Sequence, residues 1–226
     1  MNFLKFLLVL LIILPKNSFA KSDKFLIAID GFHANFNHQF SIQNKARSPY
    51  SPINDTVNDN KIGGSLSLGY IFYNKRFSIA PEVFYDYINI SSKDFFYHEN
   101  DRKTGEENAY VNDGINIKDR YGARLNFGYR VYGNLNLFLN AGIANVNSEY
   151  IWRNYDIQGD DIKGDTNYKE SKISGIYGAG FTIDVTNNLI FKSGYDFQQL
   201  NNTYVIDGLT NTIRIHTIRI GTIFAF

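Results

Sequence analysis

The chain has 226 residues, with 23 Lys and Arg against 22 Asp and Glu, and it contains no Cys. The near-balance of charge gives no reason to expect a nucleic-acid partner, and the absence of Cys excludes disulfides and thiolate metal sites. Aromatic residues make up 16% of the chain, although its mean hydropathy is only -0.26. A transmembrane β-barrel shows this combination because only every second residue of its strands faces lipid.

Residues 1–20 are predicted to be a cleaved signal peptide. Lys5 gives a positive start, and the apolar run from Phe6 to Leu14 has nine residues, whereas a membrane-spanning helix needs about 20. Small residues precede the predicted cleavage site between Ala20 and Lys21. A buried N-terminal helix is the alternative. Cleavage would leave one domain, residues 21–226, in which the loss of Lys5 and Lys16 leaves 21 basic and 22 acidic residues.

The stretch from Arg120 to Val131 shows the alternation that is expected of a strand. One face carries six apolar or aromatic residues, and the other carries Arg120, Arg124 and Arg130 with small or polar residues between them. A helix would bring a charged residue into its apolar stripe at this spacing, so a strand is favoured. The apolar face consists of Tyr121, Ala123, Leu125, Phe127, Tyr129 and Val131.

The same pattern predicts eight strands, an even number that suits a single-chain bacterial barrel. Strands of this length cross a bilayer when they are tilted. They are predicted at Phe25–Phe36, Ile62–Tyr73, Arg76–Asn89, Lys118–Tyr132, Leu135–Val146, Lys172–Thr186, Leu189–Gln198 and Thr212–Phe226.

Short and long connections alternate along the chain. The short ones are the turn-forming pairs Asn74-Lys75, Gly133-Asn134 and Asn187-Asn188. Outer-membrane barrels have short periplasmic turns and longer extracellular loops, so the fold class predicted is all-β, an eight-stranded antiparallel transmembrane β-barrel that follows a cleaved signal peptide. The four long connections are predicted to be extracellular loops at Asn37–Lys61, Ile90–Ile117, Asn147–Ser171 and Gln199–Asn211.

The last eight residues alternate toward two aromatic side chains that share one face, Phe224 and Phe226. Together with Arg219 and Gly221 they resemble the C-terminal assembly signal that the outer-membrane insertion machinery reads. An ordinary aromatic girdle strand at the periplasmic rim is the alternative interpretation.

The signal peptide, the eight alternating strands and the terminal Phe226 resemble the outer-membrane β-barrel domain family, which includes OmpA-like and opacity-type surface proteins. The resemblance covers nearly the whole mature chain. It implies a compact barrel in the bacterial outer membrane that has no bound cofactor and often serves as an adhesin or surface antigen. Pro81 departs from the strand pattern because proline cannot donate to a ladder, so we expect a bulge or one missing ladder bond there.

Several charged residues on the predicted inward faces fall at similar heights above the periplasmic turns. An eight-stranded barrel has an interior just wide enough for side chains, and buried charges are tolerated only when they are paired. We therefore predict a lumenal network that plugs the barrel, with a gated ion path as the alternative. Its members are Glu82, Arg124, Asp196, Arg219 and, with an ambiguous register, Asp30.

Candidates for chemistry are few. The chain has only four His residues, and His216 lacks the partnered Ser that a barrel hydrolase needs. His98 stands beside carboxylates in a predicted loop, and the acidic stretch Asp156–Asp165 lacks the spacing of a calcium loop. The sequence thus predicts no catalytic residue, no metal site and no cofactor.

The predicted loops are rich in aromatic residues, which are typical of protein-binding surfaces when charged groups stand beside them. The alternative is that these rings sit at the headgroup belt. The most favoured function is a surface protein, an adhesin or antigen whose loops contact a host surface protein while its wall contacts outer-membrane lipid. A narrow passive channel and a barrel enzyme acting on lipid or peptide are the alternatives. The candidate contact residues are Phe95, Phe96, Tyr97, Tyr150, Trp152 and Tyr155.

Overall fold

The computed structural model describes residues 23–42, 53–100, 107–155, 161–201 and 209–226. Within them no helix is long and apolar enough to span a membrane. The predicted signal peptide and its cleavage residues, Ala20 and Lys21, lie outside the described residues. The strands are β1 (Lys24–Ile42), β2 (Ile53–Asn74), β3 (Phe77–Asn100), β4 (Glu107–Tyr132), β5 (Leu135–Tyr155), β6 (Asp161–Asp184), β7 (Leu189–Asn201) and β8 (Leu209–Ala225).

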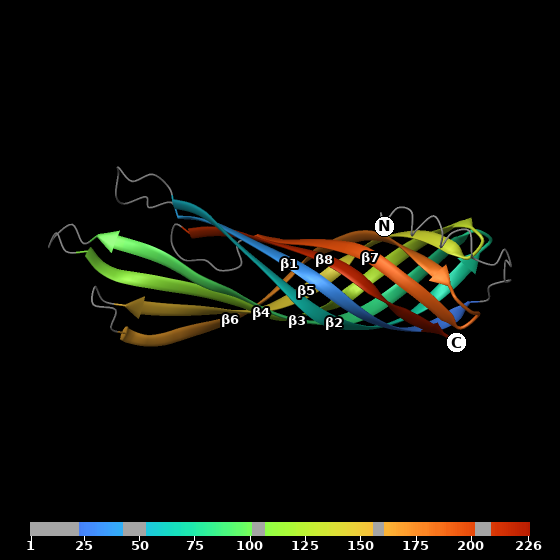
Figure 1. Ribbon diagram of the computed structural model, residues 1–226, viewed down its shortest axis with the longest axis horizontal. Coiled ribbons are helices and arrows are strands. Elements are labelled where there is room, and N and C mark those ends of the chain that lie inside the picture. The colour runs from blue at the N-terminus through green and yellow to red at the C-terminus, as the bar shows by residue number, and fades with distance from the viewer. Residues whose placement is uncertain (1–22, 43–52, 101–106, 156–160, 202–208) are drawn as a thin grey trace, which may run out of the picture.

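The strands form one closed antiparallel barrel in sequence order, in which β8 pairs with β1 (Figure 1). The predicted eight-stranded barrel is confirmed. Phe25 and Phe226 exchange two backbone hydrogen bonds of 3.2 and 3.0 Å at the end of the seam. The tight turns lie at this end, where Lys75 and Gly133 have positive φ angles of 55° and 51°. Short turns face the periplasm in outer-membrane barrels, which makes this end periplasmic.

The outer wall of the barrel is a belt of apolar side chains. In β4, Tyr121, Leu125 and Phe127 are 41–51% exposed, whereas Arg120 and Arg124 are at most 3% exposed. Lipid tails solvate apolar groups, so this outward exposure has no cost in a bilayer while the charges face the lumen. The alternation that predicted the strand is therefore the alternation between lipid and lumen.

Beyond this belt the pattern inverts without a break in the strand. In β8, Ile218 and Ile220 point outward and are 56% and 57% exposed, but Ile213 and Ile215 are completely buried inside. Outside the bilayer, water surrounds the wall, and apolar groups then gain by facing the interior. The inversion marks where the protein leaves the membrane on the extracellular side.

The barrel divides into two four-stranded sheets above the inversion. The β2–β3 ladder ends at Gly64 and Tyr87, and the β6–β7 ladder ends at Ile176 and Gln198. The β1–β2, β1–β8, β3–β4, β4–β5 and β5–β6 ladders continue for many residues beyond these points, whereas the β7–β8 ladder ends at Asn201. Figure 1 shows the resulting fork at its left, with β1, β2 and β8 diverging from β3–β6. We call the two arms the β2 arm (β7-β8-β1-β2) and the β3 arm (β3-β4-β5-β6).

The predicted strand ends and loops were therefore wrong on the extracellular side. Strands β3 and β4 have 24 and 26 residues, and much of the predicted loop Ile90–Ile117 is paired strand. The strands were predicted to end where outward apolar residues end. A backbone ladder does not need them, because its hydrogen bonds are made by main-chain groups. Bulges accompany the change, as between Tyr87 and Ile90, where Asn89 has a φ of 49°.

Pro81 interrupts one ladder but creates no bulge. The β2–β3 pairing passes from Gly69–Glu82 to Phe72–Ile79 in one register and omits the pairs between them. The pairing of Pro81 with β4 is unbroken. The missing N–H therefore affects only the side of β3 that faces β2. Of the two expected outcomes, a bulge or a missing ladder bond, the structure shows the second.

Two adjacent glycines at the base of the fork provide a matched test of packing. A Cβ at Gly63 would overlap the Phe32 ring and the Tyr87 carbonyl oxygen, whereas one at Gly64 would meet no atom within 4 Å. We predict that Gly63→Ala lowers the free energy of unfolding by about 1–3 kcal/mol, the usual cost of overpacking. Gly64→Ala should leave it unchanged or raise it. Urea unfolding of both variants in lipid vesicles measures this, and equal effects would contradict the packing described.

Candidate functional site: the lumenal ion network

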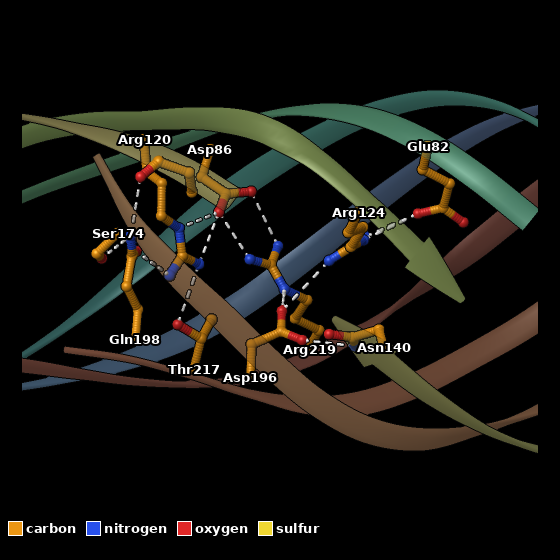
Figure 2. Close-up of polar contacts among 11 residues, drawn as sticks. Glu82, Asp86, Arg120, Arg124, Asn140, Ser174, Asp196, Gln198, Thr217 and Arg219 are labelled. Carbon is orange, nitrogen blue, oxygen red and sulfur yellow. Dashed lines mark hydrogen bonds and ion pairs between the residues drawn. The ribbon is translucent and has the colours of Figure 1, made fainter. Parts of the chain in front are cut away.

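Arg219 is the centre of a buried ion network at mid-barrel. From β8 it donates two hydrogen bonds to the carboxylate of Asp86 on β3, with Nη1–Oδ1 and Nη2–Oδ2 distances of 2.9 and 2.7 Å. Its Nε also donates to Asp196 of β7. A planar guanidinium matches a carboxylate in this two-bond arrangement. One side chain thus connects β8 to its neighbour β7 and, across the lumen, to β3 (Figure 2).

A second arginine extends the network toward the periplasm. Arg124 of β4 donates from Nε to Glu82 at 3.0 Å and from Nη1 to Asp196 at 3.3 Å. Lys192 of β7 places its Nζ 3.6 Å from Glu82, and Asn140 of β5 donates to Asp196 at 2.9 Å. Asp196 therefore accepts hydrogen bonds from β4, β5 and β8, and its two oxygens join three strands.

A third arginine lies on the extracellular side of the first. Arg120 donates to Asp86 at 2.8 Å, to Gln198 at 3.2 Å and to Thr217 at 3.3 Å. Gln198 in turn donates to Ser174 of β6 at 2.9 Å. With Asn140 of β5, the members of the whole network come from six strands, β3 to β8 (Figure 2).

The network is shielded from solvent and nearly balanced in charge. Arg120 and Arg219 are 0% and 1% exposed, and Asp86 is 0% exposed. Phe84 and Phe32 place their rings 5.0 and 5.1 Å from the guanidinium carbons of Arg124 and Arg219, where the ring faces attract the cations. Three arginines and Lys192 face three paired carboxylates and Asp30. Removing only one partner of such a pair is strongly destabilising, because the remaining charge stays buried.

Two apolar clusters lie in the lumen, one on either side of the charges. The periplasmic cluster consists of Leu26, Ala28, Ala80, Ile190, Ile223 and Ala225. The extracellular cluster is larger and lies on the fork side of the charges. Its members are Phe32, Ala34, Phe36, Ile88, Ile90, Ile115, Ile117, Val146, Leu200, Ile213 and Ile215.

The structure brings four of the five predicted lumenal residues together: Glu82, Arg124, Asp196 and Arg219 are in direct contact or share a partner. Asp30 is 2% exposed and faces the lumen, but its carboxylate oxygens have no hydrogen bond within the described residues. Prediction from the sequence missed Asp86, Arg120 and Lys192. Asp86 lies four residues beyond Glu82 and Arg120 four before Arg124, so the two-residue period alone would have placed both in the lumen.

The residues of the predicted assembly signal divide between the two faces of β8. Phe224 and Phe226 are 41% and 67% exposed on the outer wall, whereas Arg219 is buried and Gly221 is partly buried. The two rings thus lie at the periplasmic end of the apolar belt. This arrangement is compatible with both the signal and the girdle interpretation.

The predicted contact residues lie in strands and not in loops. Phe95, Phe96 and Tyr97 belong to β3, and Tyr150, Trp152 and Tyr155 belong to β5. The loop assignment was wrong because the ladder between β3, β4 and β5 continues through polar sequence. Their side chains fall outside the described part of the chain, so their role as contacts remains a prediction.

Polar groups above the belt have simple local partners. His216 Nδ1 lies 2.6 Å from the Tyr195 hydroxyl, and its ring centroid is 5.1 Å from that of Phe197. The hydrogen bond from Lys118 lowers the pKa of the Glu149 carboxyl. Burial lowers the pKa of His38, in the β2 arm, to about 4, which keeps it neutral at pH 7. No group of three His, Asp or Glu among the described residues could hold a metal ion.

A family model, the OmpA-like transmembrane domain, matches residues 30–226. The chain belongs to this family. Membership of this family, together with the barrel fold, places the protein in the bacterial outer membrane, where the apolar belt faces lipid. A search of curated proteins gives no match.

Several solved outer-membrane barrels are similar to this family member. The outer-membrane protease OmpT of Escherichia coli is 10% identical, with a TM-score of 0.53, and the alignment covers 93% of this chain and 99% of that one. Neisserial surface protein A is 14% identical, with a TM-score of 0.48 and coverage of 91% and 100%. The attachment invasion locus protein of Yersinia pestis is 13% identical, with a TM-score of 0.41 and coverage of 88% and 99%. At these identities the likeness is one of fold.

Neighbouring inward and outward positions on β6 test the network. A side chain at Gly178 would overlap the Asp196 carboxylate and Asn140, whereas Ala179 points to lipid. We predict that Gly178→Val lowers the free energy of unfolding by about 3 kcal/mol or more, because it separates buried ionic partners. Ala179→Val should have little effect. Urea titration in vesicles, with heat-modified gel migration as a check of folding, measures the difference; two equal losses would contradict the placement.

Proposed function

We propose that the protein acts at the cell surface as an adhesin or surface antigen, through the two arms that project from the barrel, and that it has no catalysis of its own. The observation that best supports this proposal is the contrast between a lumen occupied by side chains and a large extracellular structure. Ion pairs and two apolar clusters occupy the lumen, while six of the eight strands have 19 or more residues. About 9–11 residues suffice to cross a bilayer. The excess length lies outside the membrane.

The proposed partner is a host surface protein, contacted by the arms. Aromatic residues of the β3 arm are the proposed anchors, because aromatic side chains supply much of the binding energy in protein interfaces. Those on β3 are Phe95, Phe96 and Tyr97, and those on β5 are Tyr150, Trp152 and Tyr155. The proposed contact with the insertion machinery occurs earlier, through the strand that ends at Phe226. The third proposed partner is the lipid of the outer membrane, which covers the apolar belt.

The channel alternative receives little support from the described lumen, where three arginines occupy the middle layer. The enzyme alternative would need a nucleophile or activated water beside a base. The described His216 has Tyr195 and Phe197 as neighbours instead. Both observations favour an interaction surface.

Shortening the β3 arm tests the proposal. Residues 91–116 would be replaced by an Asn-Gly turn, which suits a two-residue hairpin, in bacteria that otherwise display the intact protein. We predict that adhesion to host epithelial cells falls by about tenfold or more, as expected when an anchor worth about 1.4 kcal/mol is lost.

The matched control is Ala123→Val, on the lipid-facing wall, in bacteria that display the same amount of protein. It should adhere as the intact protein does. If the shortened protein supports the same adhesion as the intact one, or if neither promotes adhesion over bacteria without the protein, the proposal fails.

A further inference from the structure

A groove crosses the lipid-facing wall of β1 to β5 and has a volume of about 690 Å³. Its floor is made by the short outward side chains of Pro81, Ala123 and Ala141. Its sides include Val83 and Ile143, which are 57% and 61% exposed. The strand register produces this relief, because Ala123 pairs with Val83 on one side and with Ile143 on the other. A long chain can therefore lie within the wall at this point.

The lining of the groove selects a hydrocarbon occupant. Two charged residues contribute to the lining, Glu82 and Arg124, but they direct their side chains to the lumen and are 6% and 3% exposed. No charged side chain among the lining residues points outward into the groove. Lipid tails are as apolar as the wall itself, so association inside a membrane depends on close packing and on small residues that permit it.

The depth of the groove matches the reach of one lipid leaflet. Pro81 follows Lys75 of the β2–β3 turn by six residues, about 20 Å along a strand. With the usual strand tilt this is about 15 Å in height, which is half of the hydrocarbon thickness of about 30 Å. The rings of Phe77 and Tyr129 lie between the turn and the groove, with their centroids 5.1 Å apart, as in an aromatic girdle at headgroup level. A lipid whose headgroup lies at the periplasmic rim therefore ends in the groove.

The periplasmic rim below the groove is basic. Lys75 and Arg76 are exposed at the β2–β3 turn, and Arg130 of β4 donates its backbone N–H to the Arg76 carbonyl at 2.7 Å. Asp23 also lies at this rim, where its carboxylate accepts a hydrogen bond from the backbone N–H of Tyr73 at 2.9 Å. Three cations thus stand near one exposed carboxylate.

The extracellular end above the groove has the opposite character. Asp119 lies four residues beyond Ala123 on the same strand, and its carboxylate accepts hydrogen bonds from Asn147 at 2.6 Å and from Tyr85 at 3.4 Å. The adjacent Lys118 is paired with a carboxylate of its own, that of Glu149. A phosphate would be repelled at this end and attracted at the periplasmic rim, so the charges favour a lipid of the periplasmic leaflet.

We propose that the groove holds an acyl chain of an anionic phospholipid of the periplasmic leaflet, with the phosphate at Lys75 and Arg76. Basic residues at a membrane surface attract anionic headgroups in this way. This rests on the proposed contact of the belt with outer-membrane lipid and gives that contact one site and one lipid class. It does not depend on the adhesin proposal.

Native mass spectrometry of the refolded full-length protein measures the binding. Phosphatidylglycerol is the anionic probe, and phosphatidylethanolamine with the same chains is the zwitterionic probe. The filling variant is Ala123→Leu, and its matched control is Ala179→Leu, which adds the same side chain to the lipid-facing wall of β6 outside the groove. The charge variant combines Lys75→Asn with Arg76→Gln. Its control, Lys118→Gln, removes a cation at the extracellular end.

We predict one bound phosphatidylglycerol per protein, with an affinity about tenfold higher than that for phosphatidylethanolamine. Ala123→Leu should weaken this binding by about tenfold or more. The charge variant should remove the preference between the two lipids, and both control variants should bind as the intact protein does. Inorganic phosphate should not displace the lipid, because the acyl chain holds it in the groove.

Equal affinity of the intact protein for the two lipids, or equal effects of Ala123→Leu and Ala179→Leu, would overturn the proposal. Displacement by inorganic phosphate would assign the rim cations to a free anion, and a dimer that Ala123→Leu abolishes would assign the groove to a second copy; either result overturns it too. If several lipids bind without preference, the groove proposal fails and the general contact of the belt with lipid stands. If no lipid binds, both fail.

Discussion

The structure depends on the pairing of Arg219 with Asp86 and Asp196 inside the barrel. Asp196 lies on β7, the neighbour of β8, but Asp86 lies on β3, so Arg219 reaches both carboxylates only when the sheet has closed into a barrel. A buried guanidinium without a carboxylate would be costly, which penalises any register that separates them. Charge pairing across the lumen thus selects one closed arrangement among those that the alternation of apolar residues alone would allow.

The inversion of the apolar pattern links this constraint to function. Within the belt the strands are apolar outside and charged inside; above it they are polar outside and apolar inside, as in β8 at Ile218 and Ile215. The same eight strands therefore form a membrane barrel below and two sheets with a water-excluding core above. Because charged and apolar side chains occupy the lumen, we propose that the extracellular arms are the part of the molecule that contacts partners.

Much of the barrel could be predicted from the sequence because lipid imposes a strict two-residue period. Heights counted from the turns also identified Glu82, Arg124, Asp196 and Arg219. Asp86 and Arg120 were missed, although they occupy inward positions. Only charged residues at one height above the periplasmic turns were grouped together, and these two lie four residues further toward the extracellular side. The arms were missed because their apolar residues, such as Ile88 and Ile90, face inward, whereas in the membrane belt the apolar residues face outward to lipid. Such a reversal depends on where the membrane ends, and the sequence does not state that position.

We propose that the ion network and the apolar clusters close the lumen, so that the protein works through its outer surface. Planar-bilayer recordings of the refolded protein test this closure. The closed lumen predicts no steady open level for the intact protein, and open levels only after Arg219 or Arg124 is replaced by Ala. A steady conductance of the intact protein, unaltered by either replacement, would contradict the account.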